Sequence, residues 1–267
     1  VGMILQQQIH QRPEPIPFYG ELGSINPQFI MPNKVAENGA EIAQGLVASL
    51  MMGQGQFCTS PGVWVVVGDE HSENYQTFIS SASEALTEQS AGVMLTPAMC
   101  AGYNAAVEER KTLKGVTLLA TGQAGNEQEC SATLFATDLA TFASTPLLQE
   151  EVFGFSALVV RCIDDAEMLQ FVSLLKGNLT ASIHGLDSDL TLSQQLSQIL
   201  AHKVGRLIYN QMPTGVEVCA SMNHGGPFPA STNIRTTSVG SEAIIRFRRP
   251  ICYQNMPSEL LPSLLRD

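Results

Sequence analysis

A cysteine in a small polar turn is the side chain of this sequence best suited to nucleophilic chemistry. Cys58 lies in segment 53–62, GQGQFCTSPG, directly before the apolar run 63–67. A cysteine kept only for packing usually lies among aliphatic side chains, where burial makes it inert. The glycine-rich backbone around Cys58 instead lets a substrate approach and offers N–H groups to it. We therefore interpret Cys58 as a nucleophile.

A carboxylate upstream is the second candidate. Glu21 lies in segment 17–27, PFYGELGSINP, which is otherwise apolar and is broken by glycine and proline. Desolvation in such a turn raises the pKa of a carboxylate towards the range that suits a general base at neutral pH. We predict that Glu21 is a base with a raised pKa, which activates a water molecule and also deprotonates Cys58.

These two segments resemble the signatures of the aldehyde dehydrogenase superfamily. Its Glu-Leu-Gly-Gly and Gly-Gln-x-Cys motifs carry the base and the nucleophile, and Ser24 stands here where most members have the second glycine. The form Glu-Leu-Gly-Ser-Ile-Asn-Pro is most similar to the bacterial branch that oxidises 2-oxoglutarate semialdehyde, also called 2,5-dioxovalerate. The resemblance continues in the same order through EEVFG at 150–154, GNLTASI at 177–183, GRLIYN at 205–210 and HGGPFP at 224–229.

The resemblance implies oxidation of an aldehyde to a carboxylic acid, with NAD or NADP as cofactor. Cys58 would form a thiohemiacetal, hydride would pass to the cofactor, and a thioester would remain on Cys58. Water activated by Glu21 would then hydrolyse that thioester. The backbone N–H of Cys58 would donate to the oxyanion. A fatty or other aliphatic aldehyde is the alternative substrate.

The resemblance also assigns binding residues. Glu151 and Phe153 match the family's Glu-x-Phe segment, in which the carboxylate binds the nicotinamide ribose and the ring packs near the nicotinamide. The carbonyl of Leu22 occupies the position that binds the nicotinamide amide. Phe155 stands where many members have proline, which alters the expected turn after Gly154. The residues that we place beside the substrate are Phe57, Thr59 and Phe228.

Members of this family are roughly twice as long as this chain, because a nucleotide-binding region comes first. The opening Val1-Gly2 resembles the end of a family segment, so we expect the missing N-terminal half as a partner. We expect residues 1–25 to contain a remnant of the nucleotide-binding domain and the Glu21 turn, and 26–230 to form the catalytic α/β domain. Residues 231–267 would form a C-terminal loop and an oligomerisation strand, in a homodimer or homotetramer.

Composition excludes several classes of function. A formal charge of −11, from 14 Lys and Arg against 25 Asp and Glu, argues against a nucleic-acid-binding face. No apolar run is long enough to cross a bilayer, and the N-terminus shows no signal-peptide pattern. We therefore expect a cytoplasmic enzyme that acts on a small molecule, with no nucleic-acid or membrane partner.

The cysteines and histidines are scattered through the chain, without the spacing of a metal site or a disulfide framework. We predict no metal site and reduced thiols. Apart from Cys58 we expect the cysteines to fill the core, namely Cys100, Cys130, Cys162, Cys219 and Cys252. The histidines are expected at the surface or in structural hydrogen bonds.

Two other classes of function stay open. A cysteine-histidine hydrolase or acyltransferase would also use Cys58, with His224 as its base, and would need no nucleotide. No third orienting residue for such a triad is evident from the sequence. The other alternative is a non-catalytic fragment that folds and dimerises without turnover.

Apolar periodicity predicts an α/β fold that positions these residues, with a mostly parallel open sheet and helices on both faces. Asn38 and Glu41 resemble a helix-capping pair, and the helix that follows reaches Gly53 and delivers the chain to Cys58. Helical spacing recurs at 75–88, 165–176 and 190–202. Strand patterns occupy 63–67, 115–120, 131–138, 156–162, 181–184 and 204–209.

The C-terminal stretch has a different pattern. Residues 221–240 are rich in Gly, Pro, Ser, Thr and Asn, which predicts a long ordered loop over the surface or a cleft. Residues 244–253 are β-like and carry Arg246, Arg248 and Arg249, which predicts an edge strand protected by charge. The resemblance implies that this C-terminal β-strand joins a small sheet that spans two subunits.

Overall fold

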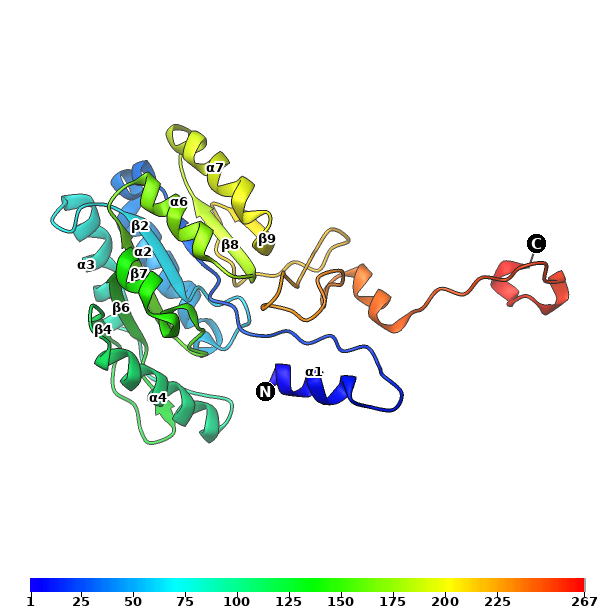
Figure 1. The fold of residues 1–267 in the computed structure, drawn as a ribbon. Coiled ribbons are helices and arrows are strands. Elements are labelled where there is room, and N and C mark those ends of the chain that lie inside the picture. Colours follow the sequence, from blue (N-terminus) through cyan, green and yellow to red (C-terminus); the bar gives the residue numbers. More distant parts are fainter. Residues whose placement is uncertain (267) are drawn as a thin grey trace.

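The computed structural model describes residues 1–266 and has a seven-stranded sheet at its centre (Figure 1). The strand order is β4-β6-β7-β2-β1-β8-β9, and every neighbouring pair is parallel except β4 with β6. The strands are β1 (Gln28–Ile30), β2 (Val63–Val67), β4 (Thr117–Thr121), β6 (Thr133–Asp138), β7 (Ser156–Cys162), β8 (Asn178–His184) and β9 (Val204–Tyr209). A separate antiparallel pair joins β3 (Gly92–Val93) to β5 (Glu129–Cys130). The α/β fold with a mostly parallel sheet is as predicted.

Helices cover both faces of the sheet. Figure 1 shows α6 (Asp165–Leu174) and α7 (Leu190–Leu200) in front of it, with α2 (Pro32–Met51) and α3 (Glu73–Thr87) behind. The remaining helices are α1 (Gly2–His10), α4 (Pro97–Thr112) and α5 (Leu139–Ser144). Adjacent central strands contribute side chains to both helical layers. Phe29 of β1 packs edge-on against Phe171 of α6, and Trp64 of β2 packs edge-on against Phe78 of α3. Strand β2 is therefore a continuous apolar run, as a strand covered on both faces requires.

The start of one helix was predicted wrongly, and another helix was not predicted. Helix α2 begins at Pro32, not after Asn38, because proline suits the first helical position, where no N–H is needed. Asn38 instead lies at a kink within the helix, with φ −131°. Helix α4 was not predicted, although Thr96 caps it by accepting a hydrogen bond from the N–H of Met99.

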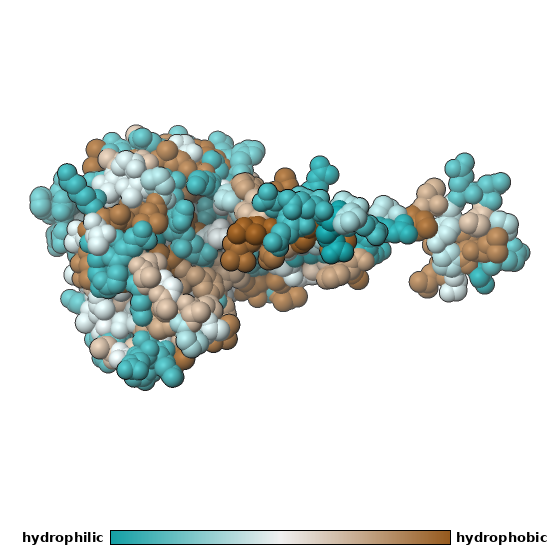
Figure 2. All heavy atoms as spheres, turned by 60° about the horizontal axis from the view of Figure 1, so that its bottom comes forward, coloured by the Kyte–Doolittle hydropathy of each residue, from teal (hydrophilic) through white to brown (hydrophobic). Residues whose placement is uncertain are grey.

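The predicted strand at 244–253 is also wrong for this structure. Residues Ser241–Phe247 form a short 3-10 helix, and the chain then projects away from the body without regular pairing (Figure 1). A strand is stable only when its N–H and C=O groups pair with a neighbour, and no other segment of residues 1–266 pairs with this one. Apolar side chains remain exposed along it (Figure 2), namely Ile244, Ile245, Phe247, Ile251, Leu260 and Leu264. Its role in oligomerisation stays a prediction.

The cysteines differ from the predicted pattern. Cys100 of α4 and Cys130 of β5 form a disulfide, so the prediction of reduced thiols is wrong for this pair. Thirty residues separate them in the sequence, and only the packing of α4 against β5 brings them together. Cys162 is buried as expected, whereas Cys219 is half-buried and Cys252 is exposed. Within residues 1–266, none of the helices has the length and apolar character that crossing a bilayer requires.

Candidate active site

The turn that precedes Cys58 depends on glycine. Helix α2 leads into residues 52–55, where Gly53, Gln54 and Gly55 all adopt positive φ. A Cβ at Gly55 would collide with the backbone of Gly154 and with the N–H of Phe155. This close approach packs the Cys58 turn against the turn that follows Glu151. Glycine is required at position 55 because the two backbones leave no room for a side chain.

Asn26 holds the Cys58 loop from the other side. It is fully buried, with a left-handed φ of 43°, and its Nδ2 donates to the carbonyls of Cys58 and Ser60, both at 2.9 Å. Its Oδ1 accepts from Ser24 Oγ at 2.7 Å and from Thr180 Oγ1 at 3.1 Å. The Ser24 hydroxyl also accepts from the N–H of Leu179 at 2.9 Å. The serine at this motif position is thus part of the scaffold under the nucleophile.

Glu21 is positioned by the long loop 221–240, which is irregular as predicted. Glu21 forms an isolated antiparallel bridge with Ser231, and the N–H of Leu22 donates to the carbonyl of Ala230 at 2.8 Å. The same loop carries His224, whose N–H donates to Thr237 Oγ1 at 2.7 Å. Two segments far apart in sequence therefore present their side chains to one place.

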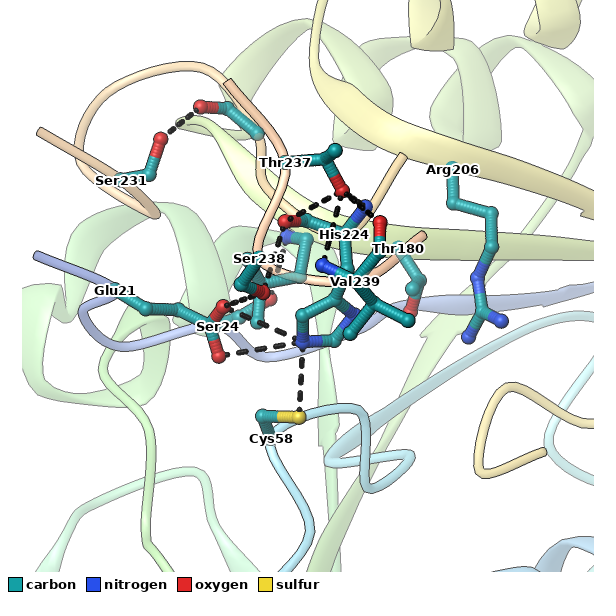
Figure 3. Close-up of polar contacts among 12 residues, drawn as sticks. Glu21, Ser24, Cys58, Thr180, Arg206, His224, Ser231, Thr237, Ser238 and Val239 are labelled. Atoms are coloured by element: carbon teal, nitrogen blue, oxygen red, sulfur yellow. Dashed lines mark hydrogen bonds and ion pairs between the residues drawn. The ribbon is translucent and has the colours of Figure 1, made fainter. Parts of the chain in front are cut away.

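Cys58, His224 and Glu21 meet there (Figure 3). Cys58 Sγ is 3.2 Å from His224 Nε2, which is 3.3 Å from Glu21 Oε1. Ser238 Oγ donates to Glu21 Oε2 at 3.3 Å. His224 is buried, Cys58 is half-buried, and the Glu21 side chain is 30% exposed, so the group opens to solvent on the Glu21 side.

The charges in this group differ from the prediction. Hydrogen bonds with Cys58 and Glu21 raise the pKa of His224 to about 9, against the opposing effect of burial. Burial pushes the pKa of Glu21 upward, but the hydrogen bond and charge of His224, the Ser238 hydroxyl and the charge of Arg246 together lower it. The expected raised pKa of Glu21 is therefore wrong. At neutral pH the pair is an imidazolium beside a carboxylate.

His224 contacts both Cys58 and Glu21, although the sequence suggested a role for it only in a hydrolase. In a hydrolase triad, one histidine nitrogen contacts the nucleophile and the other contacts the orienting residue. Here Nε2 makes both contacts, so Glu21 cannot orient the ring from behind. The geometry places two polar groups on one side of a single nitrogen, which is not the hydrolase arrangement.

A cavity of about 420 Å³ begins at Leu22, the residue after Glu21, and is also lined by Gly23 and Glu151, whereas Glu21, Cys58 and His224 do not line it. The N–H of Ser24 donates to Glu151 Oε2 at 3.2 Å. Burial raises the pKa of Glu151 to about 7, against the effect of that hydrogen bond and with a contribution from the charge of Glu21. Leu22 and Glu151, predicted cofactor residues, thus share one cavity. Phe153 is 39% exposed and does not line it.

The predicted substrate residues are not gathered at one point. Phe57 is 42% exposed next to Cys58, whereas Thr59 is buried. Phe228 is 59% exposed and lines a neighbouring groove, which shares Lys176 and Pro229 with that cavity. The structure therefore leaves Phe57 as the predicted substrate side chain that is exposed beside the nucleophile.

Arg206 of β9 is a cation near Cys58 that the sequence did not indicate (Figure 3). Burial lowers the pKa of Arg206, and negative charge at Cys58 opposes this effect. Its guanidinium donates to the backbone carbonyls of Pro213 and Gly215.

Comparison with known proteins identifies the family of this arrangement. A model of the aldehyde dehydrogenase family matches residues 1–244. The chain is 41% identical to alpha-ketoglutaric semialdehyde dehydrogenase 2 of Azospirillum brasilense, and the match covers 100% of this chain and 50% of the relative. It is 39% identical, with the same coverage, to alpha-ketoglutaric semialdehyde dehydrogenase of Acinetobacter baylyi. The chain spans about half the length of these curated relatives.

Solved structures share the fold. A mutant of proline utilization A from Bradyrhizobium japonicum aligns with a TM-score of 0.72 and 20% identity, over 92% of this chain and 24% of that one. Gamma-glutamyl-gamma-aminobutyraldehyde dehydrogenase from Burkholderia cenocepacia aligns with a TM-score of 0.72 and 17% identity, over 92% of this chain and 48% of that one. At these identities the likeness concerns the fold alone.

Proposed function

Because this chain belongs to the aldehyde dehydrogenase family, we propose that it carries the nucleophile and the base of an NAD(P)-dependent aldehyde oxidation. The observation that carries this proposal is the 3.2 Å contact between Cys58 Sγ and a largely buried His224. A protonated imidazole against the sulfur can donate a hydrogen bond to it and so stabilise negative charge on the proposed nucleophile.

In the first half of the reaction, the Cys58 thiolate adds to the aldehyde carbon and forms a thiohemiacetal. The backbone N–H of Cys58 donates to the oxygen that becomes negative. A bound nicotinamide dinucleotide supplies the acceptor for the hydride that leaves this carbon. A thioester then remains on Cys58, and the aldehyde carbon has been oxidised.

In the second half, Glu21 accepts a proton from water, and the hydroxide equivalent adds to the thioester carbonyl. Collapse of that adduct breaks the C–S bond and releases the carboxylic acid. His224 stabilises the departing Cys58 thiolate with its Nε2–H. The lowered pKa of Glu21 keeps its carboxylate ionised, so the base is ready at neutral pH although it is weaker than predicted.

The described residues fit a nicotinamide dinucleotide on one side of the site. Leu22 and Glu151 line the same cavity, and a carboxylate is the group that ribose hydroxyls can donate to. The main-chain carbonyl of Leu22 is the proposed acceptor for the nicotinamide amide. Phe153 is proposed to pack near the ring only after its exposed side chain turns inward. NAD and NADP remain equal candidates.

We propose 2-oxoglutarate semialdehyde, an acidic aldehyde, as the substrate. Support comes from the printed names of the two curated relatives and from Arg206, whose charge interacts with Cys58. A guanidinium whose charge acts at the nucleophile can attract a substrate carboxylate. We expect Arg206→Met to raise KM for an acidic semialdehyde while leaving KM for a neutral aliphatic aldehyde unchanged. An equal rise for both would show that Arg206 does not recognise the substrate carboxylate.

The proposed organisation keeps residues 26–230 as the catalytic α/β domain, 1–25 as the Glu21 turn with its leading segment, and 231–267 as the loop and oligomerisation segment. A cytoplasmic homodimer or homotetramer stays a prediction. Because the curated relatives are about twice as long, turnover assays should use a protein of their length.

The direct test is Cys58→Ala in such a protein, followed by aldehyde-dependent NAD(P)H absorbance. We expect turnover to be abolished and cofactor binding to survive. The matched control is Cys219→Ser with Cys252→Ser, which should keep turnover because neither residue touches the site. Product formation without nucleotide would favour a hydrolase, and wild-type turnover in Cys58→Ala would refute the nucleophile.

A further inference from the structure

The group formed by Glu21, Cys58 and His224 presents the three kinds of donor atom that a thiophilic divalent metal ion binds (Figure 3). Their ligand atoms all lie within 4.8 Å of one another, and within residues 1–266 no other such trio is this close. We propose that these side chains reversibly bind zinc, or a divalent cation of similar softness, through thiolate, imidazole and carboxylate.

Two of the three separations between ligand atoms are close to those of a tetrahedral site. With Zn–S of about 2.3 Å and Zn–N or Zn–O of about 2.0–2.2 Å, neighbouring ligand atoms are roughly 3.3–3.6 Å apart. His224 Nε2 is 3.2 Å from Cys58 Sγ and 3.3 Å from Glu21 Oε1. The remaining edge, from sulfur to carboxylate, closes by rotation of the partly exposed Glu21 side chain. Three protein ligands leave the fourth position to water.

Neighbouring residues hold the ligands in place. Ser238 Oγ donates to Glu21 Oε2 at 3.3 Å, which leaves Oε1 for the metal. Asn26 Nδ2 fixes the Cys58 carbonyl at 2.9 Å, and Thr237 Oγ1 accepts from the His224 N–H at 2.7 Å. Such outer contacts orient metal ligands and strengthen binding.

The charges balance. A thiolate and a carboxylate neutralise a divalent cation, and the proton shared by Sγ and Nε2 leaves to the solvent when the metal takes its place. Arg206 and Arg246 oppose a cation, but each also hydrogen-bonds to neighbouring groups, which limits its approach to the ligand atoms. Arg206 donates to two backbone carbonyls, and Arg246 bonds Thr236 and stacks on Tyr19.

A metal on Sγ occupies the lone pair that would attack a carbonyl, so binding would inhibit the proposed reaction. Only this consequence rests on the proposed function. Metal binding itself is measurable on the 267-residue chain without turnover, so failure of one idea is distinguishable from failure of the other.

The experiment is a titration of the chain with Co²⁺, which replaces zinc and reports its ligands by absorption. We expect one ion per chain, a thiolate-to-cobalt charge-transfer band, and the intense visible bands of four-coordinate cobalt. Competition with zinc should remove all of them. Cys58→Ser should abolish the charge-transfer band, and His224→Gln and Glu21→Gln should each weaken binding by at least about tenfold.

The matched control is Cys219→Ser with Cys252→Ser, together with His10→Gln at an exposed histidine. These changes should leave the bands and the affinity as they are. Circular dichroism checks that every variant is folded. If His224→Gln does not fold, the loss of affinity in Glu21→Gln still tests the proposal. A charge-transfer band that survives Cys58→Ser, its loss in the control, or weak six-coordinate spectra throughout would overturn the proposal.

Discussion

The side-chain amide of Asn26 donates a hydrogen bond of 2.9 Å to the main-chain carbonyl of Cys58. The donor lies in the Glu21 segment and the acceptor in the Cys58 segment, so one buried amide couples the segments that carry the proposed base and the proposed nucleophile. Its other partners, Ser60, Ser24 and Thr180, tie this coupling to strands β2 and β8.

Asn26→Asp should destabilise the chain by about 2–4 kcal/mol, because it replaces a donor by an oxygen that faces two buried carbonyls. Urea unfolding measures the loss. Asn255→Asp is the matched control, since Asn255 also has a left-handed φ of 51° but is exposed. Equal effects at the two positions would show that the buried hydrogen bonds contribute little.

Gly55→Ala should cost about 2–4 kcal/mol, from the left-handed φ and from collision with the backbone of Gly154 and Phe155. Gly102→Ala, on the exposed face of α4 with nothing near its Cβ position, should instead stabilise by about 0.5–1 kcal/mol. Thermal unfolding compares them. A tolerated Gly55→Ala would mean that the two turns are not held against each other.

His224→Gln should slow iodoacetamide alkylation of Cys58 by about tenfold or more, because one charge-assisted hydrogen bond is worth about 1.5 kcal/mol or more. Peptide mass spectrometry follows each site separately. The exposed Cys252 in the same chain is the internal control and should react at an unchanged rate. An unchanged Cys58 rate would separate His224 from activation of the thiol.

Glu21→Gln, made in a protein of the relatives' length, should separate the two halves of the reaction. We expect a burst of NAD(P)H, accumulation of acyl-enzyme, and steady turnover lower by roughly a hundredfold or more, as for a lost general base. Stopped-flow absorbance and intact mass measure these quantities. The absence of both burst and adduct would place Glu21 in the activation of Cys58 instead.

Buried His184 should make stability fall at mildly acidic pH. Burial, with a contribution from Lys34, lowers the pKa of His184 to about 4, whereas an unfolded histidine has a pKa of about 6.5. The unfolded chain therefore takes up the proton first. The stabilisation is complete above pH 6.5 and is lost as the pH falls towards 4, by up to about 3 kcal/mol.

Urea unfolding at several pH values tests this dependence. His184→Gln should flatten the curve between those two pH values, whereas His10→Gln, at an exposed histidine, should keep the wild-type slope. Identical curves for His184→Gln and wild type would assign the slope to other groups.

Much of the fold was predictable from local pattern. The continuous apolar run 63–67 forms the central strand β2, because a strand buried on both faces has apolar side chains throughout. The helical spacing at 190–202 forms α7, because a helix buried on one face has apolar side chains at helical period. The sequence could not show that 244–253 fails to form the predicted strand, since its pattern says that a strand is possible but not whether a partner is present. Helix α4 was missed although Thr96 and Pro97 mark its start.

For the site, the sequence motifs alone predicted Cys58 and Glu21 as the reactive pair, because glycine-rich turns around a thiol or a carboxylate are a local property. Tertiary structure decided the rest. The contact of His224 with Cys58 joins residues 166 positions apart, and the same histidine reverses the predicted pKa shift of Glu21. Charge and hydrogen bonding depend on distance in space, and a linear sequence does not contain that distance.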